Sequence, residues 1–157
     1  IYALKKAKEN RCTTILNPAP ARKIDEENFK LIDFFTPNES EAEFYLNKKI
    51  KTEIDFKDAG NELLKKGVKN IIITMGEKGI YFANNEENFF INAYKLKQPV
   101  LDTTGAGDAF NGALTVGLAN NLDIKEALTF AVKIAGISTT KLGAAASMPF
   151  KKDLVNY

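Results

Sequence analysis

Residues 101–112 of this chain read Leu101-Asp102-Thr103-Thr104-Gly105-Ala106-Gly107-Asp108-Ala109-Phe110-Asn111-Gly112. Apolar residues follow at helical spacing, so a helix is predicted to start near Gly107. The start of a helix offers unpaired backbone N–H groups and a partial positive charge. Gly105 and Gly107 let the backbone approach a ligand without a Cβ in the way. The segment therefore predicts an anion hole with one carboxylate, Asp108, beside it.

Asp108 has two interpretations on this pattern alone. A glycine-rich segment that ends in an aspartate is often a loop whose carboxylate caps the following helix. The alternative is a base for phosphoryl transfer, in which an alcohol loses its proton while charge builds on a migrating phosphate. The two roles are compatible.

The composition indicates a globular protein of ordinary size. The chain has 157 residues, of which 45% are hydrophobic and 27% are charged, so we expect one domain with a sizeable core. A formal net charge of +2 gives no reason to invoke nucleic acid or a membrane as a partner. The chain has no histidine, which excludes Ser-His-Asp catalysis and histidine-based metal sites.

The single cysteine, Cys12, allows no intramolecular disulfide, which fits a reducing compartment; we expect a cytoplasmic protein. No apolar run is long enough to span a bilayer. The chain opens at Ile1 within an expected helix and without a methionine. We therefore expect it to be a piece of a longer protein.

Predicted strands and helices alternate along most of the chain. The pattern predicts an α/β fold with an open, mostly parallel sheet and helices on both faces. Expected helices cover 1–10, 25–33 with Asp25 as N-cap, 39–46, 56–66 with Gly67 as C-cap, 107–119, 123–140 and 150–156. Expected strands cover 13–17, 34–36, 71–74, 80–83, 89–93 and 94–100. Asn17, 36–38, 74–76 and 102–108 follow predicted strands, where ligands bind in such sheets.

Four further segments support the first one: Asn17–Arg22, Thr36–Glu43, Ile73–Gly79 and Gly143–Pro149. In this order, the segments resemble those of the ribokinase-like (phosphofructokinase-B-type) family of sugar and nucleoside kinases. The resemblance extends over essentially all 157 residues, but only to the C-terminal half of that family. It implies a Rossmann-like three-layer fold truncated at its N-terminus, with residues 1–157 forming one nucleotide-binding and catalytic domain.

The resemblance implies ATP-dependent phosphorylation of a sugar hydroxyl, with ribose converted to ribose 5-phosphate. Asp108 would be the base, and the N–H groups of Gly105, Ala106 and Gly107 would hold the charge of the phosphate. The alternatives are a kinase of another sugar or nucleoside, and an inactive nucleotide-binding fragment. The expected partners are ATP and a small sugar.

Ligand roles follow from the same resemblance. The implied nucleotide-binding residues are Asn38, Thr74, Met75, Gly76, Glu77, Lys78, Gly79, Gly107, Asp108 and Val132. Glu41 would act on Mg²⁺ through water molecules. A potassium loop would comprise Asp102, Thr104, Ser138, Lys141, Gly143 and Ser147.

Each ligand role has a structural alternative. Asn38 and Glu41 also form the pattern of a helix capping box, Gly76 and Gly79 that of a simple turn, and Asp102 that of a turn residue at a strand end. Val132 and Lys133 stand where the family often carries Asn or His beside the adenine. We expect Glu39 and Glu43 to face solvent.

The resemblance also implies what the chain lacks. The family's sugar-binding residues lie mostly in its N-terminal half, together with a small lid that forms the dimer contact. A sheet without the strands of that half has an open edge, which favours self-association.

Overall fold

The structure is a computed structural model that describes the backbone of residues 1–156 and the side chains of residues 1–154. The chain divides into two compact units. Unit 1 contains residues 1–76 and 80–90, and unit 2 contains residues 77–79 and those from 91 onward. Each unit is described by itself below.

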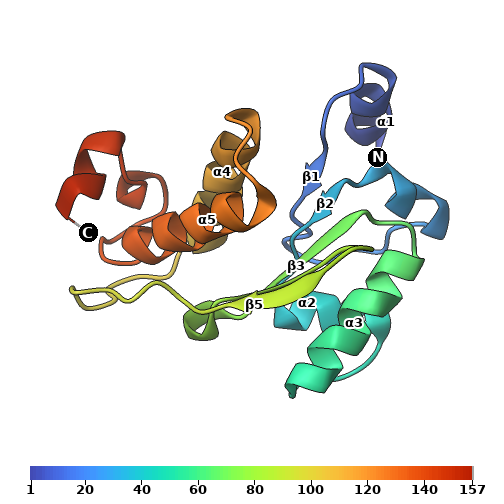
Figure 1. Ribbon diagram of the computed structural model, residues 1–157, viewed down its shortest axis with the longest axis horizontal. Coiled ribbons are helices and arrows are strands. Elements are labelled where there is room, and N and C mark those ends of the chain that lie inside the picture. Colours follow the sequence, from blue (N-terminus) through green and yellow to red (C-terminus); the bar gives the residue numbers. More distant parts are fainter. Residues whose placement is uncertain (157) are drawn as a thin grey trace. The chain divides into compact units, whose positions relative to one another are not determined.

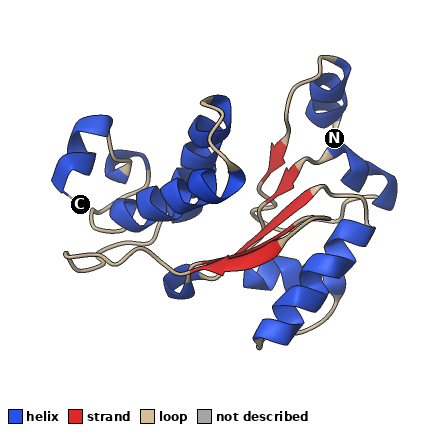
Figure 2. Cartoon of the chain, viewed as in Figure 1, coloured by secondary structure: helices blue, strands red, loops and turns tan. Residues whose placement is uncertain are grey.

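A five-stranded sheet forms the framework (Figures 1 and 2). Its strands are β1 (Ile15–Leu16), β2 (Phe34–Phe35), β3 (Asn70–Thr74), β4 (Ile80–Ala83) and β5 (Asn88–Ile91), and they are neighbours in that order. The first three are parallel to one another, whereas β4 runs antiparallel to β3. The predicted α/β fold with a mostly parallel sheet is confirmed.

The helices of unit 1 are α1 (Tyr2–Glu9), the 3₁₀ helix η1 (Glu26–Leu31), α2 (Glu39–Leu46) and α3 (Glu53–Lys65). Helix α3 starts earlier than predicted because Thr52 and Asp55 form a capping box. The C-cap of α3 is Lys66 rather than Gly67, which follows it with φ +108°. The helix expected over 25–33 is a 3₁₀ helix; Asp25 occupies its N-cap position, but its side chain makes no cap hydrogen bond.

The core of unit 1 forms around β3. Its residues Ile71, Ile72 and Ile73 are fully buried. Ile71 and Ile73 belong to an apolar cluster that also contains Phe56 and Leu63 of α3. Helices α2 and α3 contact β3 (Figure 1). Each fully buried side chain of this size contributes about 1.5–3 kcal/mol relative to an exposed one, so β3 anchors the unit.

Unit 2 contains two long helices, α4 (Ala106–Ala119) and α5 (Ile124–Ser138). They come very close at Gly117, where an added Cβ would lie 2.9 Å from the Cβ of Ala127. The other helical segments of this part of the chain are short 3₁₀ helices: η2 (Gly76–Lys78), η3 (Ala145–Ser147) and η4 (Lys151–Asn156). The expected helices over 107–119, 123–140 and 150–156 are therefore present with small shifts of their ends.

The prediction of a strand over 94–100 is wrong. These residues form no regular element, although apolar Tyr94 and Leu96 alternate with Lys95 and Lys97. The alternation has another cause, because Tyr94 and Leu96 lie against Gly136 of α5, within 4 Å of where its Cβ would be. An alternating pattern can thus arise from packing on a helix.

The expectation that Glu43 faces solvent holds only in part, because its side chain is 19% exposed. Its carboxylate accepts a hydrogen bond from the backbone N–H of Ile50 at 3.0 Å and pairs with Lys49 at 2.8 Å. The hydrogen bond from Lys49 is the main cause that lowers the pKa of Glu43. Glu43 therefore closes the turn that leads out of α2.

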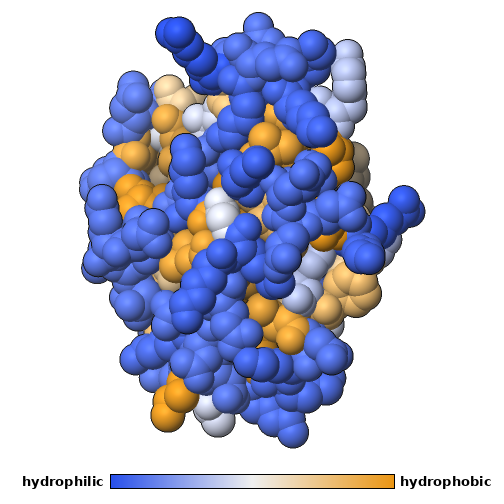
Figure 3. Space-filling model, turned by 90° about the vertical axis from the view of Figure 1, so that its right-hand side faces the viewer, coloured by the Kyte–Doolittle hydropathy of each residue, from blue (hydrophilic) through white to orange (hydrophobic). Residues whose placement is uncertain are grey.

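The face shown in Figure 3 carries mainly hydrophilic side chains, with hydrophobic ones in separate patches. In the part of the chain that the structure describes, no helix is both long enough and apolar enough to cross a membrane.

Asp33 ties three segments of unit 1 together. Its carboxylate pairs with Lys8 of α1 at 2.5 Å and with Lys69, next to β3, at 2.9 Å, and it accepts the backbone N–H of Thr14 at 2.9 Å. Burial alone would raise the pKa of Asp33, but these hydrogen bonds outweigh burial and hold the pKa well below its usual range. The ionised carboxylate therefore stabilises the folded unit.

We predict that Asp33→Asn lowers the free energy of unfolding at pH 7 by about 1–3 kcal/mol, because two charged partners lose their acceptor. Since the pKa of Asp33 is depressed in the folded state, its contribution is present above about pH 4 and declines as the pH falls below that value. Urea unfolding at pH 7 and pH 3 measures this difference. Exposed Asp58 provides the control Asp58→Asn, and equal effects of the two substitutions would contradict the prediction.

Candidate functional site

The glycine turn 103–107 leads directly into α4. Gly105 is the N-cap of α4, with φ +79°, and Ala106 donates its N–H to the carbonyl of Thr103 at 3.2 Å. Glycine brings no side chain to cap the first turn of the helix, whose early N–H groups have no intrahelical acceptor. This donor set fits an anionic group such as a phosphate.

Asp108 is the third residue of α4 and not its cap. The alternative interpretation of Asp108 as an N-cap is therefore wrong. Its side chain is exposed, and among residues 1–154 none gives its carboxylate a hydrogen bond or an ion pair. The carboxylate is thus accessible to a ligand.

The turn packs against the segment 143–148. A Cβ added at Gly105 would lie 3.2 Å from Ala144 and 3.2 Å from the Cε of Met148. Because φ is also positive there, a larger residue at 105 would be both crowded and strained. The protein's own packing and backbone conformation therefore account for the glycine at 105.

The expected potassium residues lie in loops of unit 2. Asp102 accepts N–H groups from Thr104 and Gly143, each at 2.9 Å. Hydrogen bonds from Thr104 and then from Gly143 lower the pKa of Asp102. Lys141 lies 3.5 Å from Asp153, and the hydroxyls of Ser138 and Ser147 donate to nearby carbonyls.

The structure thus brings together Asp102, Thr104 and Gly143. Among the described residues, no group of three or more Cys, Asp or Glu could hold a metal ion. A cation at these loops would depend on carbonyl oxygens, and this role stays a prediction.

In unit 1, the structure brings together Asn38, Glu41 and Thr74. Asn38 and Glu41 form the predicted capping box: Asn38 Oδ1 accepts the N–H of Glu41 at 2.9 Å, and Glu41 Oε2 accepts the N–H of Asn38 at 2.8 Å. Asn38 also forms a parallel bridge with Thr74 at the end of β3. The capping role is confirmed, whereas the roles of Asn38 in nucleotide binding and of Glu41 on Mg²⁺ stay predictions.

The segment 74–79 contains two glycines with different surroundings. Gly76 has φ +56° and open space around it. Gly79 has φ +100°, is buried, and lies directly against the backbone of 91–93. Between them, Glu77 and Lys78 are exposed in the 3₁₀ turn η2, whereas Met75 is buried. Close packing explains Gly79, and Gly76 remains accessible to a ligand.

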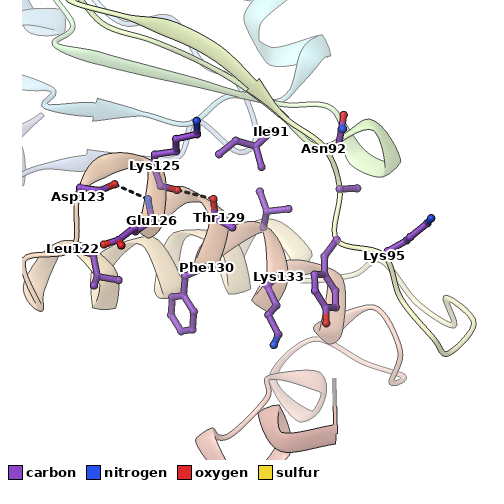
Figure 4. Close-up of a pocket in the computed structure, with 13 residues that line it drawn as sticks. Ile91, Asn92, Lys95, Leu122, Asp123, Lys125, Glu126, Thr129, Phe130 and Lys133 are labelled. Atoms are coloured by element: carbon purple, nitrogen blue, oxygen red, sulfur yellow. Dashed lines mark hydrogen bonds between the residues drawn. The ribbon is translucent and has the colours of Figure 1, made fainter.

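A pocket of about 750 Å³ lies between α5 and residues 91–95, all within unit 2 (Figure 4). Val132, expected beside the base of a nucleotide, is among its lining residues. The Lys133 ammonium lies 5.3 Å from the ring centre of Tyr94, and Thr129 donates to the carbonyl of Lys125 at 2.7 Å. Tyr94 also lines this pocket, a position that its alternation with lysines did not predict.

Comparisons with known proteins agree with one another. Residues 1–151 match the family described as pfkB family carbohydrate kinase. The ribokinase of Staphylococcus aureus is 39% identical over 155 residues, which cover 98% of this chain and 50% of that protein. The crystal structure of ribokinase from Thermotoga maritima has a TM-score of 0.85 at 36% identity. The match covers 98% of this chain and 51% of the Thermotoga maritima chain.

A structure of Arabidopsis thaliana ribokinase, complexed with ribose and ATP, has a TM-score of 0.89 at 29% identity. The match covers 98% of this chain and 49% of the Arabidopsis thaliana chain. The chain thus spans about half the length of the curated relatives that it matches.

We predict that Gly79→Ala destabilises the protein more than Gly76→Ala. Both changes place a Cβ at a positive φ, which costs about 1–2 kcal/mol, but at position 79 the Cβ also collides with backbone atoms, which adds at least about 1–3 kcal/mol. Urea unfolding of the two variants measures the difference. Equal losses of stability would mean that Gly79 does not lie against the backbone of residues 91–93.

Proposed function

Because the chain belongs to the pfkB family of carbohydrate kinases, we propose that it supplies the nucleotide-binding and catalytic part of an ATP-dependent sugar kinase. Ribose is the proposed acceptor, since relatives named ribokinase match nearly the whole chain and one of them was solved with ribose and ATP. In this proposal residues 1–157 form one domain, corresponding to the C-terminal half of the full enzyme.

One observation carries the proposal: an exposed carboxylate without a described partner, Asp108, stands in the first turn of a helix whose N-terminal N–H groups have no side-chain cap. Asp108 would accept the proton of the attacking hydroxyl. The N–H groups of Gly105 and Gly107 would face the charge that develops on the phosphoryl group, and that of Ala106 would join them on leaving the carbonyl of Thr103, to which it donates at 3.2 Å. Phosphoryl transfer needs mainly such positioning and electrostatic support.

ATP would supply the phosphoryl group, and Mg²⁺ would neutralise part of its charge. Residues 74–79, Asn38 and Val132 would hold the nucleotide, with Glu41 acting on Mg²⁺ through water. Open space at Gly76 and the position of Val132 in a pocket support these roles. Asp102, Thr104, Ser138, Lys141, Gly143 and Ser147 would line the loops that hold a potassium ion.

A second candidate is a nucleotide-binding module without catalysis of its own. The uncapped start of α4 and the open space at Gly76 support it, because both would serve binding without a chemical step. Titration calorimetry of the chain with Mg·ATP, followed by a ribose-dependent ADP assay after complementation with the N-terminal half of the Staphylococcus aureus relative, separates the two candidates: the module binds ATP but forms no ADP even when complemented.

For the kinase, we predict that Asp108→Asn lowers kcat by about 10²–10⁴-fold, because proton transfer in the transition state is lost. The affinity for Mg·ATP should stay within about twofold, since Asn keeps the size of the side chain and the turn. Activity is measured as ADP formation after complementation with the N-terminal half of the Staphylococcus aureus relative.

Asp58→Asn is the matched control, because Asp58 is exposed on α3 and is not among the residues proposed to bind ATP, Mg²⁺ or the sugar. This variant should keep both ATP binding and activity. An equal loss of ATP affinity and turnover in Asp108→Asn would indicate a structural role for Asp108 instead.

We further predict that potassium stimulates turnover in the complemented enzyme when it replaces tetramethylammonium at constant ionic strength. A cation held by these loops would place positive charge close to the turn that receives the phosphoryl group. Rates measured across a potassium titration test this. A flat response would contradict the potassium assignment of the loops while leaving the proposed kinase activity intact.

A further inference from the structure

We propose that Asp102 is a positioning residue that fastens the glycine turn 103–107 to the segment 139–148, so that the turn is ordered before a ligand arrives. The importance of the turn for catalysis rests on the proposed function, but the fastening itself is a property of the folded chain. Asp102 therefore has a role that does not require a cation.

The two oxygens of the Asp102 carboxylate bind different loops. Oδ1 accepts the N–H of Thr104, inside the turn, at 2.9 Å. Oδ2 accepts the N–H of Gly143, which is 41 positions away in the sequence, at 2.9 Å. Hydrogen bonds between a charged acceptor and N–H donors are stronger than neutral ones. A single half-buried carboxylate thus bridges Thr104 and Gly143, which both lie outside helices and strands.

Backbone contacts support the bridge from one side. The N–H groups of Leu101 and Asp102 both donate to the carbonyl of Thr139, at 2.8 and 3.2 Å. Thr139 is the C-cap of α5. The residues that lead into the turn are therefore anchored to the end of a helix, and Asp102 itself has little freedom to move.

Packing supports the bridge from the other side. Ala144 and Met148 lie against the position that a Cβ at Gly105 would occupy. Three contacts thus hold the turn. The carbonyl of Thr139 binds the residues that lead into it, and the Asp102 carboxylate binds Thr104 within it. Ala144 and Met148 pack against Gly105, where α4 begins. Removing the central bond should loosen the turn without unfolding α4 or α5.

Asp102→Asn tests this selectively. An Asn side chain keeps one oxygen acceptor but places an NH₂ donor where the carboxylate had its second oxygen, so at least one of the two N–H groups loses its partner. Asp123→Asn is the control, because its single cap hydrogen bond survives the same substitution. Both variants keep the length of the chain and most of its contacts.

The measurement is amide hydrogen exchange and amide chemical shift by NMR of the ¹⁵N-labelled chain without nucleotide. In Asp102→Asn we expect exchange to rise about tenfold or more at Gly143 and within 104–107, with upfield amide shifts at Thr104 and Gly143. Exchange within α5 should rise by no more than the shift of the urea midpoint accounts for, whereas a general loss of stability would raise exchange in the turn and in α5 alike. Asp123→Asn should leave the turn as in the unaltered chain.

Unchanged exchange and shifts at Gly143 and in the turn would overturn the inference, as would a rise spread uniformly over α4 and α5. Addition of Mg·ATP to the unaltered chain then tests the proposed function separately, through amide shifts at 105–107. An absence of these shifts would count against nucleotide binding, while the exchange data would still decide whether Asp102 fastens the turn.

Discussion

The double-sided burial of β3 is the constraint on which unit 1 depends. Ile71, Ile72 and Ile73 are shielded from water completely, so every backbone polar group between them must find a partner within the sheet. Parallel β2 and antiparallel β4 supply these partners. The antiparallel neighbour in turn allows a short connection, and the segment 74–79 makes it at the end of β3, where Asn38 also lies.

Local signals predicted the elements whose ends are determined by their own residues. The pattern Asn38-x-x-Glu41 marked the start of α2, and Thr52-x-x-Asp55 carried the same signal for α3, where it was overlooked. The failures concern partners that are remote in sequence. Whether 94–100 pairs with a strand or lies on a helix depends on α5, which begins more than twenty positions later.

The candidate site shows the same division. Glycine spacing before an apolar helix predicted a helix that starts near Gly107, and α4 starts at Ala106 with Asp108 in its first turn and not at its cap. Spacing could not show that Gly79 is packed against 91–93, because that contact depends on how the chain returns through β5. Nor could it show that Asp102 reaches Gly143, since a separation of 41 residues has no local signature. The sequence therefore predicts the chemistry of single segments, but it does not predict the contacts between segments that are far apart in the chain.

The outer edge of β1 bears on how this chain would meet another molecule. The strand is two residues long, and Pro18 and Pro20, which follow soon after it, have no N–H to donate. Such an edge offers a neighbouring strand few hydrogen bonds, so it is a poor template for uncontrolled sheet extension. The self-association that an open sheet edge favours would therefore have to gain most of its stability from side-chain contacts rather than from strand pairing.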